Sequence, residues 1–241
     1  MRHAPPGLAR DMALFLDFDG TLVPLQARPD DVHLPEGGAA TLQGIAEALG
    51  GALALVTGRD VRDLSRRVPN SLWRAGNHGL AIARPDAEAS PLPAPPALVR
   101  EAAENAASIA SELWVETKGP VLAIHHRERP DLSDEIVRLT LAVIDPQTDY
   151  HIERGKGIVE LKPRGANKGE AVRRLMTEQA FLGRLPVFIG DDTTDEDGFE
   201  AVLELGGISV KVGEGETIAE YRLGGPADVW QWLETGRDGI S

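Results

Sequence analysis

The chain has 241 residues, of which 42% are hydrophobic and 26% charged, a composition typical of a globular protein with one large domain or two small ones. A formal net charge of −13 disfavours nucleic acids and anionic membranes as partners, because both bind basic surfaces. The absence of Cys excludes disulfides and a cysteine nucleophile. The sequence has no signal-peptide pattern and no apolar run of about 20 residues, so we expect a cytoplasmic protein.

The first predicted element is the apolar run 13–16, which ends in Asp17-Phe18-Asp19-Gly20-Thr21-Leu22. Such runs are typical of buried parallel strands, and open α/β sheets bind ligands outside the carboxyl ends of their strands. Two carboxylates one residue apart are unfavourable unless a cation or a proton separates them. The segment suits an aspartate nucleophile, a neighbouring acid/base and Mg²⁺, although an acidic strand exit without chemistry fits it as well.

Two further apolar runs end in polar residues. Residues 53–56 lead into Thr57-Gly58-Arg59, and residues 185–190 lead into a stretch with five carboxylates. That acidic stretch is either a solvated loop or a cation site, and its place directly after a buried strand favours the cation site. Between these runs, Lys168 lies in the segment 165–170, which opens a predicted helix over 171–181. The helix dipole disfavours a lysine at a helix start unless the lysine faces an anion.

A proline-rich segment, residues 84–96, predicts a stiff passage out of the core, and residues 162–165 predict the return. The expected domains are therefore a core, residues 1–84 and 163–241, and an inserted cap, residues 85–162. The pattern of the insert predicts the order α-β-β-α-β-β, an open-faced sheet backed by helices. Its expected elements are helix 97–112, strands 114–118 and 121–127, helix 133–144, and strands 149–154 and 158–162.

The closing part predicts a strand over 208–212 and helices over 199–205 and 227–233, with Trp230 and Trp232 as packing residues. The whole pattern predicts an α/β protein with a Rossmann-like parallel sheet.

In this order, the DxDGT segment, Thr57, Lys168 and Gly190-Asp191-Asp192-Thr193-Thr194-Asp195 resemble the haloacid dehalogenase-like (HAD) phosphatases. The resemblance spans residues 14–195 and implies a parallel-sheet core with a C2-type cap. Segments 76–79, 115–119, 123–127 and 155–163 resemble the trehalose-6-phosphate phosphatase branch of that superfamily.

The resemblance implies a role for each core motif. Asp17 would be the nucleophile that forms an aspartyl-phosphate, and Asp19 the acid/base. Thr57 and Lys168 would bind the phosphoryl group, and the turn at Gly20 would aim backbone N–H groups at it.

A Mg²⁺ cofactor is implied in the same way. The Asp17 side chain, the Asp19 main-chain carbonyl and the Asp191 side chain would supply ligands, with Asp192 and Asp195 in the surrounding shell.

Charged residues of the insert form the implied sugar-binding set. By pattern alone they fit a solvated strand face, and it is the resemblance that assigns them to the substrate. The full implied set of substrate-binding residues is Gly20, Arg59, Glu116, Lys118, Arg127, Lys156 and Glu160.

The function expected from these residues is hydrolysis of trehalose 6-phosphate, with a trehalose-6-phosphate synthase as a possible partner in addition to the small-molecule substrate. The alternatives are a phosphatase for sucrose 6-phosphate or a mannosyl-glycerate phosphate, and a non-catalytic sugar-phosphate sensor or scaffold. The intact Asp17, Asp19, Lys168 and Asp191 argue against the sensor, because binding alone does not require a nucleophile.

Overall fold

The structure is a computed structural model that describes residues 4–26, 28, 31–144 and 148–240. The chain forms two compact units: a first unit, Met1–Ser90 with Asn167–Ser241, and a second unit, Pro91–Ala166. The first division therefore lies inside the proline-rich segment 84–96, and the second lies just after the predicted return, residues 162–165. Both lie a few residues beyond the expected domain bounds of 84 and 162.

The first unit is built on a seven-stranded sheet in which only β4 is antiparallel to its neighbour. The strand order is β11-β10-β9-β1-β2-β3-β4. Strands β1, β2 and β9 are the three predicted apolar runs and are almost wholly buried, as expected for strands covered on both faces. The strands are β1 (Met12–Leu16), β2 (Leu53–Val56), β3 (Trp73–Gly76), β4 (Ala81–Ala83), β9 (Leu185–Gly190), β10 (Ile208–Val212) and β11 (Tyr221–Leu223).

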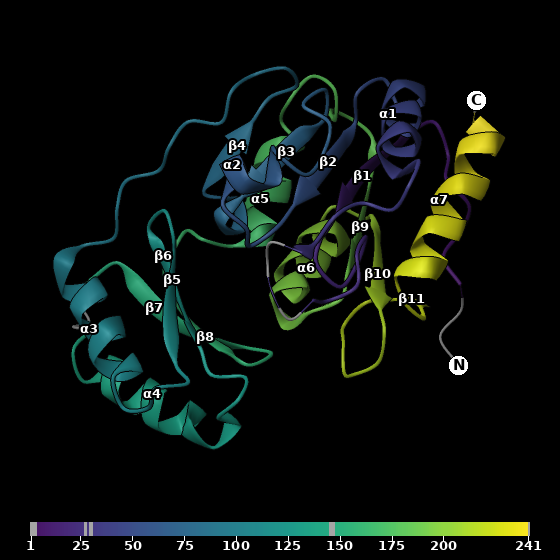
Figure 1. Cartoon of the computed structure of the whole chain (residues 1–241). Helices are drawn as coiled ribbons and strands as arrows, with labels where there is room; N and C mark the ends of the chain where they lie inside the picture. Colours follow the sequence, from purple (N-terminus) through teal and green to yellow (C-terminus); the bar gives the residue numbers. More distant parts are fainter. Residues whose placement is uncertain (1–3, 27, 29–30, 145–147, 241) are drawn as a thin grey trace. The chain divides into compact units, whose positions relative to one another are not determined.

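Helices cover both faces of this sheet (Figure 1). Helices α1 and α7 pack against each other, and α5 and α6 form a second pair on the opposite side. The helices are α1 (Gly38–Ala48), α2 (Val61–Leu64), α5 (Lys168–Leu175), α6 (Glu196–Glu204) and α7 (Pro226–Ile240), with short 3₁₀ turns at Asn77–Gly79 and Thr193–Asp195.

The strand order creates a switch point beside β1. From β1 the chain runs outward through β2 and β3 on one side, whereas β9, β10 and β11 extend the sheet on the other side. In open α/β sheets, the crevice at the carboxyl ends of such strands is where ligands bind. Residues directly after β1, β2 and β9 are therefore brought to one place.

The second unit has the expected order α-β-β-α-β-β, with an antiparallel sheet in the order β5-β6-β8-β7. One face of the sheet packs on the helices through Leu122, Ile124, Val159 and Leu161. Residues of the other parity face away from that core. The elements are α3 (Ala97–Ala107), β5 (Trp114–Lys118), β6 (Val121–His125), α4 (Ser133–Leu141), β7 (Tyr150–Gly155) and β8 (Ile158–Pro163), with a 3₁₀ turn at Pro130–Leu132.

Several predicted helix ends were wrong. Helices α3, α4 and α5 end at residues 107, 141 and 175, whereas the sequence pattern had extended them to 112, 144 and 181. After α3 and α5 a hydroxyl turns back onto the last turn: Ser108 donates to the Asn105 carbonyl and Thr177 to the Arg174 carbonyl. Such local bonds compete with further helical ones. Helix α7, in contrast, is longer than its predicted range 227–233.

None of the helices within the described ranges is long and apolar enough to cross a membrane.

Candidate active site

A buried lysine joins two aspartates at the centre of the first unit. Asp17 follows β1, and Lys168 is the first residue of α5, whose N-cap Asn167 accepts a hydrogen bond from the Glu170 amide. Lys168 Nζ lies 2.8 Å from Asp17 Oδ1 and 2.7 Å from Asp195 Oδ1. This contact spans 151 positions of sequence and explains why a lysine is stable at that helix start.

The electrostatics of this triad are unusual. Burial raises the pKa of the Asp17 carboxyl well above its ordinary value, and the charge of Asp195 raises it further, while Lys168 acts in the opposite direction. Burial disfavours the charged form of Lys168 as well, but the charges of Asp17 and Asp195 raise its pKa overall. Lys168 is therefore positively charged, and added positive charge at the site would favour the ionised form of Asp17.

Asp195 organises the loop after β9. Its Oδ2 accepts hydrogen bonds from the backbone amides of Asp191 and Asp192, at 2.9 and 2.8 Å. Gly190 permits this approach, because a Cβ there would lie 2.3 Å from the Asp195 carboxylate carbon. Asp192 and Asp195 also form a reciprocal capping box for the 3₁₀ turn Thr193–Asp195. Asp192 and Asp195 were both expected in the shell around the metal ligands. Asp195 is the one whose carboxylate lies inside the site.

Carboxylate oxygens of Asp17, Asp191 and Asp195 lie within 4.8 Å of one another, and all three residues are buried. Hard oxygen donors in this number suit Mg²⁺, which retains water in its remaining positions. Gly20, at φ +84°, leaves room beside them, since a Cβ there would lie 2.3 Å from Asp191 Oδ2. The donor set, its burial and this clearance fit a divalent cation.

Asp19 is held by an arginine. Arg59 Nε and Nη2 donate to the two carboxylate oxygens of Asp19 at 2.6 and 2.7 Å, and Arg59 Nη1 donates to Asp63 at 2.9 Å. Asp63 in turn accepts from Arg67. Burial lowers the pKa of Arg59, but its hydrogen bonds to Asp19 and Asp63 and the charges of these carboxylates raise that pKa overall. Arg59, expected to bind substrate, thus donates to two carboxylates of its own unit.

Thr57 lies two residues before Arg59 in the chain. It follows β2 and is buried, and its hydroxyl oxygen accepts a 3.3 Å hydrogen bond from the Arg59 amide. Its place at a strand end beside β1 is the one that the sequence pattern predicted.

In the second unit, the expected sugar-binding residues form one connected row. Lys118 Nζ lies 3.3 Å from Glu160 Oε1 and 3.7 Å from Glu116 Oε2. The same Glu116 oxygen lies 2.9 Å from His125 Nε2. Burial favours a higher pKa for Glu116, but the contacts with His125 and Lys118 lower it overall, so its carboxylate is ionised.

Arg127 and Lys156 are exposed residues of the same unit. Arg127 follows β6, and its Cβ lies 3.1 Å from where a Cβ on Gly157 would be, so it lies beside the turn that carries Lys156. The structure therefore brings Arg127 and Lys156 to one end of the sheet, while the residues of the row lie along its strands.

The chain is similar to known proteins over most of its length. The family model described as trehalose-phosphatase matches residues 15–226. Trehalose-6-phosphate phosphatase of Escherichia coli K12 is 39% identical over 95% of this chain and 88% of its own length. The chain belongs to the trehalose-phosphatase family.

A second relative supports the family assignment, and a solved structure shows the fold. A probable trehalose-phosphate phosphatase of Sinorhizobium fredii is 40% identical over 83% of this chain and 77% of its own length. The C-terminal domain of Candida albicans trehalose-6-phosphate phosphatase has the same fold, with a TM-score of 0.83, 21% identity and 99% of each chain covered. The expected HAD fold is confirmed, and this member of the trehalose-phosphatase family is a phosphoric monoester hydrolase.

Sequence reasoning missed Lys211 of this trehalose-phosphatase. It is buried in β10, opposite Gly190 in register, and its Nζ donates to the Asp191 main-chain carbonyl at 2.5 Å. A lysine inside an apolar strand next to the acidic strand end was the signal that could have found it. His125 was missed too, although it stands opposite Trp114 in the predicted hairpin.

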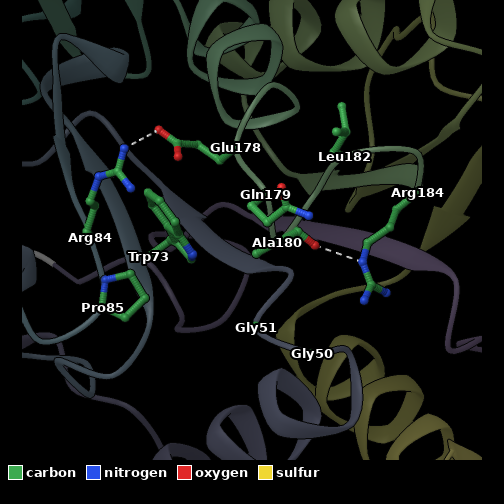
Figure 2. A pocket seen from close by; sticks show the side chains of 10 residues that line it. All are labelled: Gly50, Gly51, Trp73, Arg84, Pro85, Glu178, Gln179, Ala180, Leu182 and Arg184. Carbon is green, nitrogen blue, oxygen red and sulfur yellow. Dashed lines mark hydrogen bonds and ion pairs between the residues drawn. The ribbon is translucent and has the colours of Figure 1, made fainter.

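A separate pocket of about 530 Å³ lies elsewhere in the first unit (Figure 2). Trp73 begins β3 and Arg184 precedes β9, so the pocket is at the amino ends of strands whose carboxyl ends carry the acidic site. Figure 2 shows Arg84 paired with Glu178, at 2.8 Å, beside the Trp73 ring. The pocket is therefore not part of the acidic site.

Proposed function

We propose that the chain catalyses the Mg²⁺-dependent hydrolysis of trehalose 6-phosphate to trehalose and phosphate, through an aspartyl-phosphate on Asp17. The observation that carries the proposal is the convergence of Asp17, Lys168 and Asp191 at the carboxyl ends of β1 and β9. The 39% identity to a trehalose-6-phosphate phosphatase supports the choice of substrate.

In the first step, an oxygen of Asp17 attacks phosphorus while the bond from phosphorus to the sugar oxygen breaks. The departing oxygen takes a proton from Asp19, so that trehalose leaves as an alcohol. Lys168 holds Asp17 in place and neutralises charge on the phosphoryl group. Thr57 donates a hydrogen bond from its hydroxyl to a phosphoryl oxygen. The Gly20 amide donates to the Val23 carbonyl at 2.7 Å, so the contribution of that turn would come from other amides.

In the second step, water attacks the phosphorus of the aspartyl-phosphate and gives its proton to Asp19. The bond from phosphorus to Asp17 breaks, and the nucleophile is restored with release of phosphate. Asp19 enters the first step protonated, which requires that one of its two hydrogen bonds from Arg59 be given up. It leaves that step as a carboxylate that both Arg59 nitrogens orient for the attacking water.

Asp17 and Asp191, together with the Asp19 main-chain carbonyl, are the proposed Mg²⁺ ligands. A bound Mg²⁺ would supply positive charge that favours ionised Asp17 and offsets the charge of the phosphoryl group. Both oxygens of Asp195 already accept hydrogen bonds, from Lys168 and from the loop amides, so we assign Asp195 to holding that loop.

For the sugar, we propose Glu116, Lys118 and Glu160 as partners of its hydroxyl groups. An ionised carboxylate accepts hydroxyl hydrogen bonds and an ammonium group donates them, so a row of the two suits a hydroxyl-rich neutral sugar. Arg127 and Lys156 would bind closer to the phosphate. A trehalose-6-phosphate synthase, which would supply this substrate, stays a predicted partner.

Phosphate release from a panel of sugar phosphates tests the proposal. The panel contains trehalose 6-phosphate, sucrose 6-phosphate, a mannosyl-glycerate phosphate and glucose 6-phosphate, each with Mg²⁺ and with a chelator. We expect the highest kcat/KM for trehalose 6-phosphate and no turnover with the chelator. Preference for another member of the panel would overturn the substrate assignment, and no release from any of them would favour the sugar-phosphate sensor.

A further inference from the structure

Trp114 stands at one end of the polar row of the second unit. It is the first residue of the edge strand β5 and has the same strand parity as Glu116 and Lys118, so the three side chains share one face of the sheet. The intervening Val115 packs on the opposite side, against the core that the sheet forms with its helices. This places a large aromatic ring beside charged groups suited to hydroxyls.

The indole of Trp114 is held flat by a neighbouring ring. His125 is its partner in register on β6, and the two rings are parallel within 2° with centroids 3.7 Å apart. The His125 ring is fixed in turn by the 2.9 Å contact of its Nε2 with Glu116. Trp114 is nevertheless 47% exposed, so a substantial part of the indole is accessible. An immobilised aromatic surface loses little entropy when a ligand packs on it.

This combination matches the two kinds of surface on a pyranose ring. A pyranose carries hydroxyls around its edge and C–H groups on its faces, so it needs polar partners at the edge and an apolar plane beneath. The row Glu116–Lys118–Glu160 supplies the first, and the exposed indole of Trp114 supplies the second.

We propose that Trp114, oriented by His125, stacks on a pyranose ring of the substrate and thereby favours sugar phosphates over phosphate esters without such a ring. The inference rests on the proposed function, since it requires a sugar phosphate as the substrate. It adds to that function a residue that recognises the apolar face of the sugar.

The test uses the full-length enzyme with Trp114→Ala and Trp114→Phe. As a matched control, Leu141→Ala removes another exposed apolar side chain of the same unit, on α4. Kinetics with trehalose 6-phosphate are compared with those for glycerol 3-phosphate, which has no pyranose ring. We expect Trp114→Ala to lower kcat/KM for trehalose 6-phosphate about tenfold, the scale of an aromatic contact. Turnover of glycerol 3-phosphate should change by less than about threefold, and Trp114→Phe should retain most of the activity.

A direct readout accompanies the kinetics. Trehalose, the unphosphorylated product, should change the tryptophan fluorescence of the wild type and of Leu141→Ala, and this change should be absent in Trp114→Phe. Equal losses on both substrates, or a Trp114→Ala variant within about twofold of wild type on trehalose 6-phosphate, would overturn the inference alone. A change only in oligomeric state would overturn it too, by assigning Trp114 to contact between copies. Failure of the wild type to hydrolyse trehalose 6-phosphate would instead overturn the proposed function and this inference with it.

Discussion

Arg59 donates hydrogen bonds to both carboxylate oxygens of Asp19, and a third nitrogen of the same guanidinium donates to Asp63. The side chain of Arg59 is about 10% exposed, and its guanidinium also lies over the Phe18 ring, 5.6 Å from the centroid. The orientation of the proposed acid/base is therefore set by a planar fork, which an ammonium group cannot reproduce.

This arrangement predicts the effect of Arg59→Lys. The charge is kept but the fork is lost, so Asp19 is no longer fixed, and kcat for trehalose 6-phosphate should fall about 10–100-fold, within the range of acid/base contributions. An aryl phosphate with a good leaving group needs less protonation and should lose less. Arg62→Lys, at an exposed position three residues along, is the control. Arg59→Lys activity within about threefold of wild type would contradict the positioning role.

Asp17→Asn should abolish turnover while the fold is retained. The amide keeps the shape of the side chain but is not a nucleophile, and one proposed metal ligand is lost. We expect a loss of at least about 10³-fold in kcat, the scale of other nucleophile removals. Wild-type enzyme with beryllium fluoride should form a phosphoenzyme mimic that this variant cannot form. A variant that turns over within tenfold of wild type would exclude Asp17 as the nucleophile.

The same substitution should stabilise the metal-free protein at neutral pH. Burial raises the pKa of Asp17, so the folded state binds this proton more tightly than the unfolded state, and stability is lost as pH rises from the ordinary Asp value of about 3.9 through the raised one. Asn carries no charge, and Lys168 keeps Asp195 as its partner. With a chelator present, Asp17→Asn should have the higher melting temperature at pH 7.5, and the difference should shrink towards pH 4. A lower melting temperature for the variant at pH 7.5 would contradict this account.

Mg²⁺ should stabilise the wild type through the acidic cluster. Three buried carboxylates within 4.8 Å repel one another, and a cation that binds only the folded state raises its melting temperature by mass action. Asp191→Ala should remove both this shift and the activity. Asp192→Asn, whose residue caps the turn Thr193–Asp195, should keep the shift. Full activity of the wild type after chelation would refute the metal assignment.

Glu116, Lys118 and Glu160 should matter in proportion to the sugar that the substrate carries. Hydrogen bonds to charged groups contribute about 1.5–3 kcal/mol, so each Ala substitution should lower kcat/KM for trehalose 6-phosphate roughly 10–150-fold. A small aryl phosphate lacks these contacts and should change by less than about threefold. Kinetics of all three variants on both substrates check the expectation. Equal losses on both would assign the row to folding or to the phosphate.

Local sequence patterns predicted the place of Asp17 in the site but only part of the role of Lys168. An apolar run followed at once by Asp17 is a local pattern, and the rules for parallel strands place its end at a ligand crevice whatever the remaining chain does. The same holds for the ends of β2 and β9, so the fold class and the core of the candidate site followed from local patterns. Lys168 was predicted from its motif and from its unfavourable place at a helix start, but its contact with Asp195 was decided by the tertiary structure.

Contacts between side chains were decided only by the tertiary structure. Arg59 is 40 residues from Asp19, and Lys211 is 20 from Asp191. Nothing in a local pattern specifies which carboxylate a guanidinium or ammonium group will meet, because that depends on strand order and on the rotamers that packing allows. Helix ends such as that of α3 were likewise set by single hydroxyl bonds that compete closely with one more helical turn. The sequence by itself determined which chemical groups gather at the carboxyl edge of the sheet, since strand polarity fixes that edge; the packed chain decided how those groups pair.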